Sequence, residues 1–156
     1  MNSTSSLEPV TARAERRAAE RVLERDRSRV FYGSRRPTER LLYLCGPMTG
    51  YPQLNREAFL LAASSLRVAG FSLVSPAEPP LLQDPQVDWN AAVRRSLGGL
   101  LECDAVATVT PRGLRQSKGA MLELTIASNL EMPVLYWQAW VLAADAWTPP
   151  ETEETA

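Results

Sequence analysis

The run AVATVT at residues 105–110, followed by QSKGAMLE at residues 116–123, decides the expected fold of this chain. The first segment is typical of a buried strand, and the second opens an amphipathic helix. Glu123 is therefore expected near the beginning of that helix. Free backbone N–H groups and the positive end of the helix dipole favour anions there, so this position would stabilise a carboxylate or a bound phosphate.

The order of strand, turn and helix recurs along the chain. Leu41–Cys45 is a short apolar run, followed by a turn with two glycines, GPMTG at residues 46–50. A helix is predicted from an N-cap at Asn55 to Gly70, and a Pro-rich loop over 76–85. The remaining spacing predicts strands over 71–75, 105–110 and 133–137, and helices over 87–102, 118–130 and 138–147.

Strands separated by helices of about a dozen residues indicate βαβ units and a parallel sheet. We therefore predict an α/β fold, a Rossmann-like parallel sheet flanked by helices, with an extra charged helix at the N-terminus. Ligands bind such sheets at the carboxyl ends of the strands, near the switch in strand order. The loops 46–52 and 111–118 leave two of these ends, so together they outline one ligand crevice.

The apolar spacing also predicts which side chains face inward. We expect the inward set to be Ala58, Phe59, Ala62 and Leu66 in one helix, and Ala92, Val93, Leu97, Leu100 and Leu101 in the next. Trp137, Trp140 and Trp147 are many aromatic residues for a chain end. Core packing is the favoured interpretation, and a subunit interface, where tryptophan is enriched, is the alternative.

Composition limits the class of protein. At 156 residues and 45% hydrophobic content, the chain is about one domain long and can bury a sizeable core. The absence of histidine excludes Ser-His-Asp and Cys-His mechanisms and disfavours a zinc site, which leaves acid–base chemistry to carboxylates, tyrosine or water. Cys45 and Cys103 are expected at opposite ends of the sheet, too far apart for a disulfide, as reduced, buried thiols.

Charge is distributed unevenly. Residues 1–40 carry ten Arg against six acidic residues, whereas residues 41–156 carry seven basic and twelve acidic residues. The net charge of −1 gives no strong field for nucleic acid, and no apolar run is long enough for a membrane. The charged N-terminus is unlike a signal peptide, so we expect a cytoplasmic protein without membrane partners. A nucleic-acid adaptor remains an alternative that the lack of interleaved aromatic residues disfavours.

The basic excess belongs to an N-terminal segment. Residues 9–30 are typical of a charged helix with a thin stripe at Val10, Ala14, Ala18 and Val22. Such a helix is expected to lie on a neighbouring element or in solvent. The predicted organisation is a basic helix and linker at 1–38, an α/β domain at 39–147 and an acidic disordered tail at 148–156.

The candidate site residues each have a purely structural interpretation as well. Neither glycine-bearing loop completes a dinucleotide fingerprint or a P-loop. Gly46 and Gly50 either form a tight connection or allow backbone N–H groups to approach a phosphate or ribose. Ser117 and Lys118 are either an N-cap and a solvated lysine or ligand contacts.

Glu123 has the same two interpretations. It could be a surface glutamate, since glutamate is a good helix former. However, Ile126 and Ala127 lie on the same helix face and are apolar, so that face points into the protein. A carboxylate on an apolar face needs an explanation.

Four collinear motifs carry a resemblance to a known group of proteins. LCGPMTG at 44–50, DW at 88–89, ECDA at 102–105 and SKGAMLE at 117–123 make about residues 41–137 similar to the nucleoside 2-deoxyribosyltransferase-like superfamily. The closest resemblance is to its small DUF4406 branch of uncharacterised domains, common in phages and prophages. The fold of that family is a Rossmann-like parallel α/β sandwich, in agreement with the layout predicted from periodicity.

The resemblance implies an activity. In the transferases and deoxynucleoside-monophosphate N-hydrolases of the superfamily, a glutamate in a Gly-x-x-x-Glu turn attacks the anomeric carbon, and Gly119 and Glu123 match that turn. An oxocarbenium-like transition state favours such a carboxylate, which the helix N-terminus is expected to keep ionised. The relatives assemble as oligomers, so a homo-oligomer is expected, and neither a cofactor nor a metal is implied. The matching substrate-binding positions are Gly46, Pro47, Met48, Thr49, Gly50, Ser117 and Gly119.

One position departs from the family pattern. Relatives carry an aspartate in an Asp-Leu or Asp-Ile pair that orients the sugar or assists proton delivery, and the corresponding pair here is Ser96-Leu97. Ser96 is therefore assigned to substrate binding, and Asp88 becomes a candidate general acid. Asp104 lies at the start of a predicted strand, away from the ligand end, so we expect it to be structural.

The sequence thus predicts cleavage or transfer of the N-glycosidic bond of a deoxynucleoside or its 5′-monophosphate, with Glu123 as the nucleophile. The alternative is a catalytically impaired nucleotide-binding module, a sensor or sequestering protein. Ser96, in place of the family aspartate, is the feature that favours this alternative.

Overall fold

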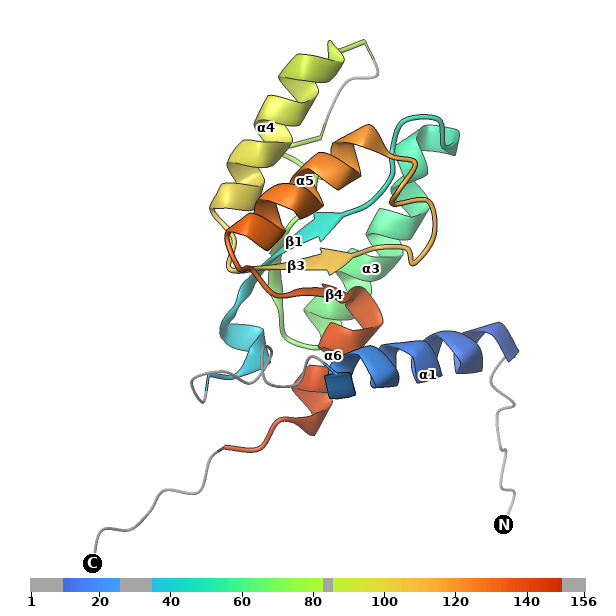
Figure 1. Ribbon diagram of the computed structural model, residues 1–156, viewed down its shortest axis with the longest axis vertical. Helices are drawn as coiled ribbons and strands as arrows, with labels where there is room; N and C mark the ends of the chain where they lie inside the picture. Colours follow the sequence, from blue (N-terminus) through green and yellow to red (C-terminus); the bar gives the residue numbers. More distant parts are fainter. Residues whose placement is uncertain (1–9, 26–34, 83–85, 150–156) are drawn as a thin grey trace, which may run out of the picture.

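A computed structural model describes residues 10–25, 35–82 and 86–149 as an α/β Rossmann-like fold (Figure 1). The strands are β1 (Leu41–Cys45), β2 (Ser72–Val74), β3 (Ala105–Thr108) and β4 (Val134–Tyr136). The α-helices of the described ranges are α1 (Val10–Arg25), α3 (Arg56–Val68), α4 (Trp89–Leu101), α5 (Lys118–Asn129) and α6 (Trp137–Ala146). Two short 3-10 helices, η2 (Pro37–Glu39) and η3 (Pro52–Asn55), precede β1 and α3. The predicted fold class is confirmed.

The four strands form one parallel sheet in the order β2-β1-β3-β4. Leu42 pairs with Ala105 and Cys45 with Thr108, so β1 and β3 end at the same edge of the sheet. The chain leaves β1 for β2 on one side and returns to β3 on the other. The strand order therefore switches between β1 and β3, the place where open α/β sheets bind their ligands.

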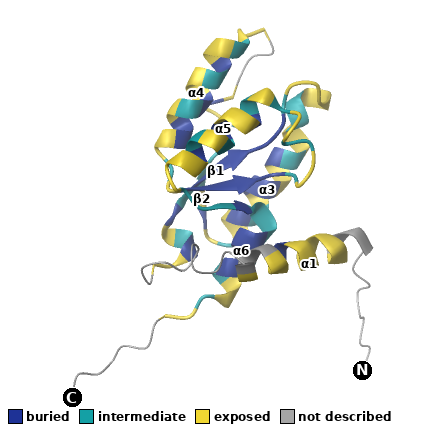
Figure 2. Ribbon diagram, viewed as in Figure 1, coloured by how far each residue is buried: buried dark blue, intermediate teal, exposed yellow. Residues whose placement is uncertain are grey.

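The central strands β1 and β3 are almost entirely buried, as Figure 2 shows, whereas the edge strands β2 and β4 are partly exposed. Side chains of a strand alternate between the two faces. Leu42 and Leu44 pack in the core with α3 and α6, whereas Tyr43 and Cys45 pack in a second core with α4 and α5. This alternation along β1 places a tyrosine hydroxyl and a thiol beneath α4 and α5.

Helix α6 supplies the largest side chain of the core. Trp140 is fully buried, its indole Nε1 donates to the Val106 carbonyl oxygen at 2.9 Å, and its ring meets Phe71 edge-on. Core packing is thus the correct interpretation for Trp140. The predicted strand over 133–137 is one residue too long at its end, because Trp137 already begins α6.

Helix α1 packs on α6, at the bottom of the view in Figure 1. Ala19 is its buried contact, whereas Ala14 and Ala18 of the predicted stripe are exposed, so the predicted face was wrong. Alanines occur on both sides of this helix, and their spacing alone does not determine which side is covered. The predictions for residues 26–30, for most of the linker and for residues 150–156 fall outside the described residues.

The inward face of α4 differs from the prediction at one position. Ala92 and Leu100 are buried as expected, but Leu101 is 62% exposed. Successive helical residues are about 100° apart, so a helix that buries Leu100 turns Leu101 outward.

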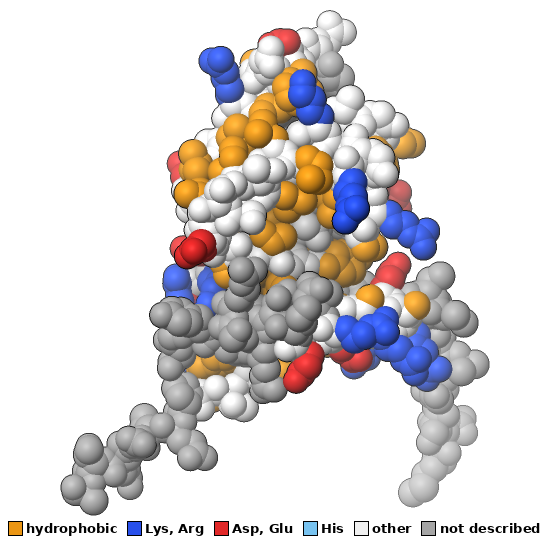
Figure 3. Space-filling model, in the orientation of Figure 1, with side chains coloured by type: hydrophobic (Ala, Val, Ile, Leu, Met, Phe, Trp, Pro, Cys, Tyr) orange, Lys and Arg blue, Asp and Glu red, His pale blue; other side chains and the backbone are white. Residues whose placement is uncertain are grey.

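Apolar side chains remain exposed over α4 and α5 (Figure 3), among them Leu101, Met121, Leu122 and Leu130. None of the helices in the described ranges is both long and apolar enough to cross a membrane.

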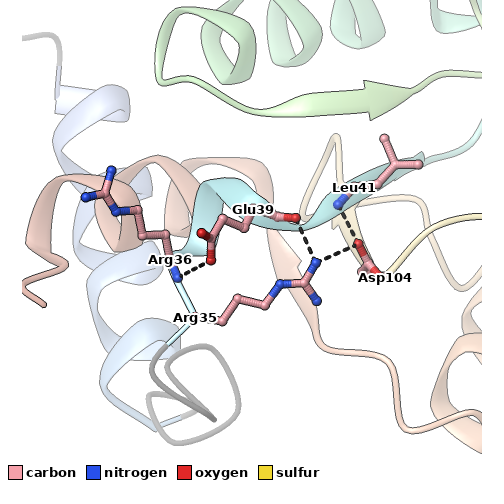
Figure 4. Close-up of polar contacts among 5 residues, drawn as sticks. All are labelled: Arg35, Arg36, Glu39, Leu41 and Asp104. Carbon is pink, nitrogen blue, oxygen red and sulfur yellow. Dashed lines mark hydrogen bonds and ion pairs between the residues drawn. The ribbon is translucent and has the colours of Figure 1, made fainter. Parts of the chain in front are cut away.

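Asp104 links the amino ends of two strands of the sheet through its side chain (Figure 4). Its Oδ2 accepts a hydrogen bond from the Leu41 backbone N–H at 2.8 Å and lies 3.7 Å from the Arg35 guanidinium, which also donates to the Glu39 carbonyl oxygen. Asp104 thereby joins the beginnings of β1 and β3, and the structural role predicted for it is confirmed. Cys45 and Cys103 are both free thiols, as predicted, but only Cys45 is buried, whereas Cys103 is partly exposed.

Candidate functional site

A cleft of about 400 Å³ lies at the carboxyl ends of β1 and β3, within the usual size range of small-molecule sites. Three segments line it: the loop after β1, one face of α4, and the loop and first turns of α5. The lining residues are Gly46, Met48, Thr49, Trp89, Ala92, Val93, Ser96, Gln116, Ser117, Lys118, Gly119, Ala120 and Glu123. The two loops that the sequence indicated therefore meet at one cleft, at the switch in strand order.

Glu123 lies deep in this cleft. It is the sixth residue of α5, only 8% exposed, on the same helix face as the buried Ala120 and Ala127. The Tyr43 hydroxyl from β1 donates a hydrogen bond of 2.9 Å to Glu123 Oε1. This contact joins the strand to the helix and orients the carboxyl group.

Burial determines how Glu123 titrates. Burial raises the pKa of Glu123 to about 7, against smaller lowering effects of the Cys45 thiol and the Tyr43 hydroxyl. The expectation that the helix N-terminus keeps this carboxylate ionised is therefore not met below about pH 7. The dipole acts within the first turn of a helix, and Glu123 lies in the second.

Tyr43 connects Glu123 to Ser96. Burial, and then the adjacent Glu123, raise the pKa of Tyr43 far above its ordinary value, while a hydrogen bond from Ser96 acts in the opposite direction. Tyr43 is thus a protonated donor at any physiological pH. Ser96 is 5% exposed and lines the cleft, so the position at which the sequence resemblance led us to expect an aspartate contacts the partner of the candidate nucleophile.

The turn after β1 is shaped by packing. A side chain at Gly46 would meet Val109 and would approach Phe59 Cζ at 3.3 Å, so the chain needs glycine there for a close approach of its own elements. This close packing supports the first of the two interpretations of Gly46, that it forms a tight connection. Asn55 occupies the N-cap position of α3, but its side chain does not cap the helix. Its Nδ2 instead donates to the Pro47 carbonyl oxygen at 2.9 Å, which fixes the turn.

Ser117 is the predicted N-cap and lies in the lining of the cleft. It is the N-cap of α5, since its Oγ accepts a hydrogen bond from the Ala120 backbone N–H at 3.2 Å, and it also lines the cleft. Gly119, in the first turn, has open space around the position that a side chain would occupy. The N–H groups of Lys118 and Gly119, before the capped Ala120, have no carbonyl partner within the helix, which makes them available to an anion.

The structure brings most of the sequence-derived site residues together. Those that line the cleft are Gly46, Met48, Thr49, Ser96, Ser117, Gly119 and Glu123, whereas Pro47, Gly50 and Asp88 do not. Asp88 is exposed at the N-cap position of α4, and the next residue, Trp89, enters the lining instead. Pro47 is buried, and Gly50 takes a positive φ of 85° that the turn requires.

A family model described as a domain of unknown function (DUF4406) matches residues 40–136, more than half of the chain. The chain belongs to the DUF4406 family. The match runs from the residue before β1 to the end of β4 and contains every residue that lines the cleft. No curated protein and no solved structure showed a significant match.

In this DUF4406 chain, sequence reasoning missed Tyr43 and gave no role to Trp89. A tyrosine in a fully apolar strand needs a partner for its hydroxyl, and that requirement could have directed attention to Tyr43. Trp89 and Lys118 begin α4 and α5 respectively, and the Lys118 ammonium lies 4.3 Å from the centroid of the Trp89 ring. Within the described residues, no group of three or more Cys, Asp or Glu side chains could hold a metal ion.

Proposed function

We propose that this protein cleaves or transfers the N-glycosidic bond of a deoxynucleoside or its 5′-monophosphate, with Glu123 as the nucleophile. The observation that carries the proposal is a buried carboxylate, 8% exposed, that lines the cleft and is held by a tyrosine hydroxyl at 2.9 Å. A carboxylate is seldom buried without a structural partner of opposite charge. The resemblance to the nucleoside 2-deoxyribosyltransferase-like superfamily supports the same assignment and carries the expectation of a homo-oligomer.

The proposed chemistry uses two steps. A Glu123 oxygen forms a bond to the anomeric carbon while the bond to the base breaks, and the electron pair of that bond leaves with the base nitrogen. Water or an acceptor base then displaces the carboxylate, as in retaining glycosidases. Tyr43 holds the attacking group in one orientation through its bond to Oε1.

The ionised form of Glu123 is the reactive one. Since the pKa of Glu123 is raised to about 7, activity is expected to increase as the pH rises through about 7. A phosphate on the ligand fits the first turn of α5, where Ser117 and the backbone N–H groups of Lys118 and Gly119 line the cleft.

A nucleotide-binding module without catalysis is the second candidate, and one observation favours it. Among the described residues that line the cleft, Glu123 is the only acidic one, so the lining offers no second carboxylate to protonate a departing base. Ser96 stands where relatives carry aspartate, and Asp88 is outside the lining. Base release, rather than binding, therefore distinguishes the two candidates.

The test is a product assay. The protein is incubated with the four common deoxynucleosides and their 5′-monophosphates, with and without an acceptor base, and the products are separated by chromatography. Released or exchanged base is expected from the parent protein, none from Glu123→Gln, and an unchanged amount from Glu102→Gln, an exposed glutamate after α4. Equal rates in the parent and Glu123→Gln would contradict the assignment, and ligand binding without base release would favour the binding module.

A further inference from the structure

The mouth of the cleft contains an aromatic ring and a cation in contact. Trp89 is the first residue of α4 and Lys118 the first residue of α5, and both line the cleft. The Lys118 ammonium lies 4.3 Å from the centroid of the indole ring. Trp89 is half-buried and Lys118 exposed, whereas Glu123 and Ser96, which also line the cleft, are buried. The cleft thus has a deep polar end and an aromatic, cationic mouth.

We propose that Trp89 and Lys118 select nucleoside 5′-monophosphates over nucleosides, because the base stacks on Trp89 and the phosphate draws the Lys118 ammonium away from the ring. This inference rests on the proposed function, in that the deep end holds a sugar near Glu123. It adds which chemical class the site takes and which residues decide it.

Stacking explains the part of Trp89. A base has a flat π face, and stacking on an aromatic side chain stabilises it whatever its hydrogen-bonding edge. Trp89 is the only aromatic residue among the described residues that line the cleft. In the free protein the Lys118 ammonium lies over the indole, so a base that stacks on that face must displace it.

Electrostatics explains the part of Lys118. A cation on an aromatic ring at an exposed site is held weakly, whereas a phosphate forms charge-assisted hydrogen bonds with an ammonium. The only acidic residue in the described lining is the deeply buried Glu123, and Asp88, next to Trp89, is exposed and outside the lining. The first turn of α5 adds backbone N–H groups beside Lys118.

The two effects are coupled. A nucleoside must move the ammonium from the indole into solvent without offering it a partner, whereas a monophosphate supplies that partner on the same molecule. A sugar phosphate engages Lys118 but leaves the indole uncovered. The preference for monophosphates is therefore expected to depend on Lys118, and the affinity for the base on Trp89.

The experiment measures binding by calorimetry in the Glu123→Gln protein, so that no ligand is consumed. The probes are the four common deoxynucleoside 5′-monophosphates, the matching nucleosides and 2-deoxyribose 5-phosphate. We expect monophosphates to bind on the order of tenfold or more tightly than nucleosides. Adding Lys118→Met should reduce this preference to the part that the backbone N–H groups of α5 supply, without weakening nucleosides. Adding Trp89→Leu should weaken monophosphates and nucleosides on the order of tenfold and leave the sugar phosphate unchanged.

Two matched controls repeat the same changes outside the cleft. Arg115→Met removes a nearby exposed cation that does not line the cleft. Trp147→Leu removes an indole whose ring centroid lies 4.9 Å from the Arg36 guanidinium carbon, a similar pair far along the chain. Both are expected to keep the parent preferences.

The outcomes separate this inference from the proposed function. A monophosphate preference that Lys118→Met leaves unchanged in size, a sugar phosphate that weakens as much as the nucleotides in Trp89→Leu, or no binding of any probe would overturn the inference. Base release by the parent protein, measured separately, tests Glu123. The expected preferences without base release would leave the inference standing and remove the catalytic proposal.

Discussion

Glu123 couples the cleft to the stability of the fold. Its pKa rises from 4.5 to about 7 on folding, because burial disfavours the charged form. A carboxyl with a raised pKa contributes its full stability below about pH 4.5, and that contribution is lost as the pH rises to about 7. At about 1.4 kcal/mol per pKa unit, the loss is about 3 kcal/mol.

Glu123→Gln keeps the shape of the side chain and removes this titration. The variant and the parent are expected to have similar free energies of unfolding near pH 4, and the variant should be the more stable by about 3 kcal/mol at pH 8. Denaturant unfolding at the two pH values measures this difference. Glu102→Gln, at an exposed position, should show no such trend, and a constant difference for Glu123→Gln would refute the raised pKa.

Tyr43→Phe tests the donor to that carboxyl. The hydroxyl lowers the pKa of Glu123, so its removal is expected to raise that pKa further and shift the pH dependence of base release upward. The Glu123 carboxyl signal in NMR reports the same shift if no base is released. Tyr136→Phe, in β4 and outside the cleft lining, is the control. An unchanged titration in Tyr43→Phe would show that the hydrogen bond does not act on the carboxyl.

Substitution by alanine is expected to change the stability of the protein in opposite directions at two glycines of the cleft. At Gly46 an added methyl group meets Val109, so Gly46→Ala should cost about 1–3 kcal/mol of stability through overpacking. At Gly119 the space is open and the backbone is helical, so Gly119→Ala should stabilise by up to about 1 kcal/mol while narrowing the cleft. Melting temperature and nucleotide affinity are measured together. Equal destabilisation by both substitutions would contradict the difference in packing between Gly46 and Gly119.

At the scale of elements, the sequence correctly predicted the ends of those helices and strands that a local sequence signal marks. Strand β1 has its predicted bounds because the apolar run ends at Gly46, and α5 begins at Lys118 because Ser117 caps it. The buried side of α1 was not predictable, since the helix has alanines on more than one of its sides. Tyr43 was missed because its neighbours depend on the order of the strands and on which helices cover each face, and a linear pattern contains neither.

The packing of helix α1 on α6 can be tested by one substitution, with a matched control at the neighbouring residue. Ala19 is 1% exposed against α6, whereas Ala18 is exposed. Ala19→Glu is expected to lower the unfolding free energy by about 1–3 kcal/mol, because it forces an unpaired carboxylate into an apolar contact. Ala18→Glu should stay within about 0.5 kcal/mol of the parent. If both variants melt like the parent, α1 does not dock on α6 in solution.

At the scale of the whole molecule, the family match ends before the core does. The match stops at residue 136, yet α6 follows directly and buries Ala139, Trp140 and Ala143 against the sheet. The Trp140 indole also donates a hydrogen bond to the Val106 carbonyl oxygen in β3, one of the two strands whose carboxyl ends border the cleft. The matched region therefore contains the site, while part of its support lies beyond it.

This division predicts what a shortened chain can do. A chain ended after Tyr136 loses the whole of α6, and removing Trp140 alone is expected to cost about 3–5 kcal/mol, against a total of about 5–15 kcal/mol for a domain. Such a chain should lose its cooperative unfolding transition and nucleotide binding together, although every residue of the cleft is present. A chain ended after Pro149 should keep both, since it retains α6. Trp140→Ala in the full chain should fall between the two. Calorimetric melting of the three proteins decides the matter, because a cooperative transition in the chain that ends at Tyr136 would mean that the cleft folds without α6.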